Sequence, residues 1–149
     1  MHYIRHALMG FSIASLLGLG ACSMAPMTSD ATALMARLDG TREVPMVTTG
    51  ATGLLEASLA PGSNVLTWKL TYAGLSGPAT AAHFHGPAMA GQNAGVVVPI
   101  TAPLASPASG NATLSPSQVA DLMAGKWYVN VHTAANPGGE IRGQVNIVP

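Results

Sequence analysis

Large apolar residues alternate with polar ones along several short segments of the chain, the pattern of a β-strand with one buried face. The clearest segments are 55–59, 66–72, 127–132 and 141–148. A continuous apolar run at 96–100 is interrupted by a proline, Pro99. Because proline cannot donate to a strand ladder, we expect that run near a sheet edge or a strand end.

Turn-forming residues separate the predicted strands. Pro, Gly, Ser and Asn cluster at 61–64, 74–78, 86–87 and 136–139. The last cluster joins two of the clearest strands, which predicts a hairpin with a longer loop. Many short strands with turns between them predict an all-β fold, an antiparallel Greek-key sandwich or barrel.

One short helix is predicted within this β fold. Ser115 is a good N-cap, Pro116 suits the first turn, and Gln118 stands where a capping box needs it. The apolar stripe and the terminating glycine follow at Val119, Leu122, Met123 and Gly125.

The N-terminal segment has the pattern of an export signal. A short start containing Arg5 precedes an uncharged run at 7–20, which is too short to span a bilayer as a helix. Leu19-Gly20-Ala21-Cys22 then matches the lipobox of bacterial lipoproteins, in which the cysteine is lipidated and becomes the first mature residue. An ordinary signal peptide that happens to contain a cysteine is the alternative.

These features divide the chain into three parts: a lipoprotein signal peptide at 1–21, a flexible tether at 22–32 and a β domain at 33–149. We therefore expect an exported protein, held to a membrane by a lipid on Cys22 and facing the periplasm or the cell exterior. Ser23 after the cysteine favours the outer membrane by lipoprotein-sorting habit.

Charge and motif content exclude several classes of function. Charged residues make up only 8% of the 149, and six cations balance six anions. So few cations cannot form the basic surface that nucleic-acid binding needs. The sequence has no nucleophile elbow, no phosphate-binding loop and no paired carboxylates of a glycosidase. We therefore expect a binding protein sooner than an enzyme, with an unknown protein partner.

Three histidines are the strongest candidates for chemistry. His83 and His85 stand two residues apart, so in a strand they point to the same face, away from Phe84. His132 ends another predicted strand, on its non-core face. If the two strands are neighbours, three imidazoles can share a copper or zinc ion. The alternative is that these histidines only brace the adjoining loops.

The residues around these histidines suggest supporting roles. Tyr128 and Asn130 share the face of His132. Glu140 and Arg142 share a face two residues apart, which allows a surface ion pair. Glu140 could instead accept a hydrogen bond from a ligating histidine. We favour a structural role, with Arg142 tying down the neighbouring loop.

Three motifs together resemble a known family, the CHRD domain. They are Leu38-Asp39-Gly40-Thr41-Arg42-Glu43-Val44-Pro45, Ala82-His83-Phe84-His85-Gly86-Pro87-Ala88, and the segment from Gly125 through His132 to Gln144. The domain is named after chordin, where it occurs in several copies, and it is also found in exported bacterial proteins. The resemblance covers roughly 33–147 and implies a single β-rich extracytoplasmic domain.

A second resemblance is to copper/zinc superoxide dismutases, which also place a His-x-His on one strand of a Greek-key barrel. The pattern maps onto His83, His85 and His132, but the ligands of a bridged zinc and the dismutase disulfide are absent. Three hypotheses follow: a lipid-anchored binding module with a metal site, a small copper-dependent redox enzyme, or a structural envelope or adhesion module.

Overall fold

A computed structural model describes residues 30–149 of the chain. The predicted signal peptide, Cys22 and most of the predicted tether lie outside the described residues. The described part forms these elements: β1 (Thr32–Asp39), the 3-10 helix η1 (Gly40–Arg42), β2 (Thr52–Leu59), β3 (Val65–Ala73), β4 (Ala79–His85), β5 (Val96–Pro99), β6 (Ala108–Thr113), α1 (Pro116–Met123), β7 (Tyr128–Thr133), β8 (Ile141–Gln144) and β9 (Asn146–Ile147).

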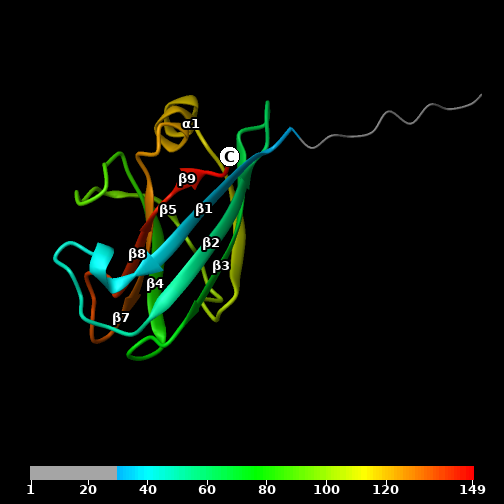
Figure 1. Ribbon diagram of the computed structural model, residues 1–149. Coiled ribbons are helices and arrows are strands. Elements are labelled where there is room, and N and C mark those ends of the chain that lie inside the picture. Colours follow the sequence, from blue (N-terminus) through cyan, green and yellow to red (C-terminus); the bar gives the residue numbers. More distant parts are fainter. Residues whose placement is uncertain (1–29) are drawn as a thin grey trace, which may run out of the picture.

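The strands form one antiparallel sheet that curls into a nearly closed barrel (Figure 1). Along the sheet the order is β5-β4-β7-β8-β1-β2-β3-β6, with β9 paired to β1. The chain therefore runs as a meander through β1, β2 and β3 and then crosses to β4, which pairs with β5 and β7. The predicted antiparallel all-β fold is confirmed.

The barrel interior is filled by the inward residues of each strand. Phe84 packs edge-on to Trp68, with ring centroids 5.1 Å apart, and also lies beside Trp127. Around these rings the core is aliphatic, as expected from a chain with only 5% aromatic residues. Its largest aliphatic members are Leu34, Leu38, Leu55, Leu66, Leu70, Leu122, Ile141 and Val129.

The helix forms as its sequence predicts and lies at one end of the barrel, near the C-terminus (Figure 1). The Ser115 side chain accepts from the Gln118 amide, and the Gln118 side chain accepts from the Ser115 amide, so the capping box is complete. Leu122 is fully buried against the core. No helix in residues 30–149 is long and apolar enough to cross a membrane.

The outer face of β7 is covered by other parts of the chain. The sequence places this face away from the core, yet every residue of β7 is buried. The reason is that loops fold back over this face: the 86–95 loop reaches the Tyr128 hydroxyl through Ala94, and the 134–139 loop reaches the His132 ring through Pro137. The sheet therefore has a second, polar buried layer outside the barrel core.

Candidate metal centre

The pairing of β4 with β7 brings the three histidines together. His83 lies directly opposite Asn130 in the register, and His85 lies opposite Tyr128. Directly paired residues point to the same face of an antiparallel sheet, and His132 shares that face because it is two residues from Asn130. Phe84 and Val129, on the opposite face, anchor both strands in the core.

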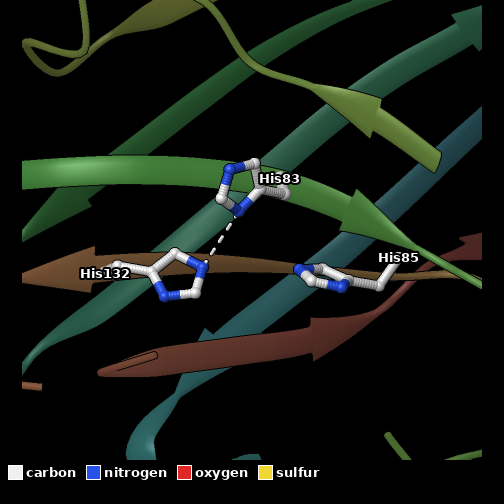
Figure 2. Close-up of side chains that lie close together, drawn as sticks. All are labelled: His83, His85 and His132. Atoms are coloured by element: carbon white, nitrogen blue, oxygen red, sulfur yellow. Dashed lines mark hydrogen bonds between the residues drawn. The ribbon is translucent and has the colours of Figure 1, made fainter. Parts of the chain in front are cut away.

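The three rings converge on one another (Figure 2). His83 Nδ1 lies 3.1 Å from His132 Nε2, and one ring nitrogen from each histidine lies within 4.8 Å of the other two. The ring centroids of His83 and His132 are 4.9 Å apart, and those of His83 and His85 are 5.5 Å apart. The expectation that the two strands are neighbours and carry clustered imidazoles is therefore met.

Backbone carbonyls fix the orientation of two rings. His132 Nδ1 lies 3.0 Å from the Pro137 carbonyl oxygen, and His85 Nδ1 lies 3.0 Å from that of Ala94. A carbonyl can only accept, so each contact forms when Nδ1 carries the hydrogen, and in that tautomer each Nε2 has a lone pair directed toward the cluster. Metal-binding histidines are commonly oriented by this kind of carbonyl contact.

The environment also favours neutral rings. Burial lowers the pKa of His83, and the neighbouring His132 and His85 lower it further. Burial likewise lowers the pKa of His132, against the opposing effect of its bond to Pro137. Neutral imidazole is the form that binds a metal ion. His85 and His132 are each 9% exposed, and His83 is more open, so solvent reaches the cluster from the His83 side.

Tyr128 and Arg142 form a stack beside His85. The His85 and Tyr128 rings are parallel with centroids 4.7 Å apart, and the Arg142 guanidinium lies 3.3 Å from the Tyr128 centroid on its other face. Arg142 donates to Asn93 Oδ1 at 2.9 Å and to the Gln92 carbonyl. Arg142 therefore contacts two residues of the 86–95 loop, and its role in tying down a loop stays a prediction.

Glu140 is completely buried and lies apart from Arg142, so the surface ion pair considered above does not form. Its carboxylate accepts from the Ser76 amide, from the Ser76 and Thr133 hydroxyls at 2.5 and 2.7 Å, and from the Thr49 hydroxyl at 2.9 Å. Within residues 30–149 no histidine donates to Glu140. The carbonyls of Ala94 and Pro137 lie against the histidine Nδ1 atoms instead. Glu140 thus connects three separate segments of the chain, those that contain Thr49, Ser76 and Thr133.

Sequence reasoning missed Glu43. It is 6% exposed, and among the described residues its Oε1 has no hydrogen-bond partner. Burial raises the pKa of Glu43, while the charge of Arg142 and a hydrogen bond from Asn130 oppose that effect. Glu43 lies far along the chain from Asn130, so residue spacing could not link the two. Its place in the first of the three motifs was the only sequence signal.

The comparisons place this fold and site in one family. The sequence model of the CHRD domain matches residues 34–145, most of the chain and nearly all of the barrel. The chain belongs to the CHRD domain family. Searches of curated proteins and of solved structures found no match.

Proposed function

We propose that this CHRD domain is an extracytoplasmic binding module, anchored by a lipid on Cys22, that holds one transition-metal ion through His83, His85 and His132. The convergence of three ring nitrogens within 4.8 Å of one another carries the proposal. Two of these rings have Nδ1 against a backbone carbonyl, a contact that favours the tautomer with the Nε2 lone pair toward the cluster.

The ligand set favours certain ions. Three imidazoles suit zinc or copper, whereas calcium and magnesium prefer sites made of oxygen ligands. Metal–nitrogen bonds of about 2.0–2.1 Å need nitrogens closer than the widest separation here, so the more open His83 ring would close by a small rotation. Copper is our first choice and zinc the second.

Metal analysis of the purified chain, made without a His tag, tests the proposal. We expect one equivalent of copper or zinc in the wild type. We expect none in His83→Ala, His85→Ala or His132→Ala, while Asn111→Ala, an exposed change on β6, keeps it. Circular dichroism confirms that each variant is folded. Folded histidine variants with unchanged metal content would contradict a metal site and leave the structural module.

A copper-dependent redox enzyme is the second candidate, because the partly exposed His83 leaves the cluster open to small molecules on one side. Superoxide turnover by the copper-loaded protein that is lost in His83→Ala would favour it. A stoichiometric but inert copper site would leave the binding module.

A further inference from the structure

Asn130 occupies a position that the three-histidine proposal does not explain. It is 3% exposed and lies in the middle of β7. Its Oδ1 is 3.0 Å from His85 Nε2 and 2.9 Å from His132 Nε2, so one amide oxygen faces both of the ring nitrogens that carry free lone pairs.

His85 and His132 each face an acceptor at both ring nitrogens, whereas a neutral imidazole has only one N–H. The Ala94 and Pro137 carbonyls take the Nδ1 hydrogens of His85 and His132, and an amide oxygen can only accept. His83 Nδ1 can donate to His132 Nε2, but no described residue donates to His85 Nε2, which faces Oδ1 as a second acceptor. This buried contact is unfavourable unless something positive lies between the two atoms. That species is either a proton on a ring or a metal ion.

The Glu43 carboxylate explains the orientation of the Asn130 side-chain amide. The Asn130 Nδ2 atom and the buried Glu43 carboxylate both lie against Gly139, and this orientation of the amide leaves Oδ1 facing the rings. In the reversed orientation the amide oxygen would face that carboxylate instead. Glu43 thus acts as a positioning residue for Oδ1, and its negative charge adds to the attraction for a cation.

We infer that Asn130 Oδ1 is a fourth protein ligand, completing an N3O site with the three histidines. This inference rests on the proposed metal site. Ligand atoms around a tetrahedral ion with bonds of about 2.0–2.1 Å are about 3.3 Å apart. Three of the six separations in this set are close to that spacing: Oδ1 lies 3.0 Å from His85 Nε2 and 2.9 Å from His132 Nε2, and His83 Nδ1 lies 3.1 Å from His132 Nε2.

An oxygen ligand changes which ion the site prefers. Amide oxygen is a harder donor than the sulfur ligands that select cuprous ion. The N3O set therefore selects divalent ions, copper(II) and zinc, over copper(I). The Asn130 carbonyl would be polarised by the ion, and the Glu43 carboxylate behind it would receive a stronger hydrogen bond from the same amide.

Cobalt(II) substitution tests this assignment, because its visible d–d absorption reports the donor set directly. We compare the full-length wild type with Asn130→Ala, Asn130→Asp and the exposed control Asn111→Ala. We expect Asn130→Ala to bind cobalt and zinc at least about 10- to 100-fold more weakly and to change the band energies. Asn130→Asp retains binding, with a shifted spectrum, and Asn111→Ala matches the wild type.

Each outcome separates the two proposals. A wild type that binds no metal overturns the metal site and with it this assignment. A wild type that binds metal, with an Asn130→Ala spectrum identical to its own, overturns only the assignment, whatever the affinity, because Asn130 then supports the rings without touching the ion. If Asn130→Ala does not fold, the Asn130→Asp spectrum decides in the same way.

Discussion

Glu140 shows how a single buried carboxylate can organise a site without touching it. Its oxygens accept from Ser76, Thr133 and Thr49, which belong to three separate segments of the chain. Within residues 30–149 no cation pairs with it, and these donors compensate the cost of burying its charge. Burial would raise the pKa of Glu140, but these hydrogen bonds outweigh burial and lower it to about 2.

This pKa predicts an acid limit to stability. The folded-state pKa of Glu140 lies below the ordinary value of 4.5, so its contribution is present in full above about pH 4.5 and is lost as the pH falls toward 2. We expect Glu140→Gln to lower the free energy of unfolding at pH 7 by on the order of 3 kcal/mol. Urea denaturation at several pH values measures this. A variant with the same loss at pH 2.5 as at pH 7 would contradict it.

Arg142 clamps the loop that orients His85. It donates to Asn93 and Gln92, next to the Ala94 carbonyl that holds the His85 ring. We expect Arg142→Met to lower stability by roughly 1.5–3 kcal/mol, because buried acceptors lose a charged donor. We also expect faster amide hydrogen exchange across 86–95. The exposed Arg37→Met is the control, and equal exchange in both variants would argue against the clamp.

At the scale of elements, the hairpin between β7 and β8 depends on one glycine. Gly139 has φ of 128°, a conformation that side chains rarely adopt, and a Cβ there would collide with the Glu43 carboxylate and the Asn130 amide. The turn and the cluster are therefore built together. Neither could be altered without disturbing the other.

We expect Gly139→Ala to destabilise the fold and to reduce metal affinity, because the new methyl group displaces Asn130 and Glu43. The matched control is Gly138→Ala in the same turn, where a Cβ meets nothing within 4 Å. Isothermal titration with zinc, together with thermal unfolding, compares the two. Equal zinc affinity in both variants would show that the cluster tolerates movement of Asn130.

The sequence predicts elements best where large apolar residues alternate or where caps are local. The strands around Trp68 and Val129, the edge strand with Pro99 and the capping box of α1 all follow from such signals. By contrast, β6 consists of small and polar residues, and in β1 the consecutive apolar residues Leu34, Met35 and Ala36 obscure the alternation. These two strands form because their neighbours supply ladder partners.

The candidate site also combines features that the sequence predicts with features that it does not. The spacing of His83 and His85 predicts a shared face, and His132 carries the same strand pattern. The pairing of β4 with β7 is a property of topology, and the burial of their outer face depends on loops far along the chain. That is why Glu43, Ser76 and Thr49 could not be found from spacing.

At the scale of the whole molecule, the proposed lipid anchor would hold the barrel at a membrane. We expect the wild type to sediment with membranes and to incorporate labelled palmitate, and Cys22→Ser to do neither while keeping its metal. Fractionation of cells expressing each form checks this. Palmitate labelling that persists in Cys22→Ser would exclude the anchor without bearing on the histidine cluster.

The complete burial of β7 also has a dynamic consequence. A strand covered on both faces opens only when most of the molecule unfolds, whereas an exposed loop opens on its own. The amides of β7 should therefore be among the last to exchange with heavy water. An ion seated on this strand would still reach solvent through the more open His83 side, so its residence time would not follow the lifetime of the barrel.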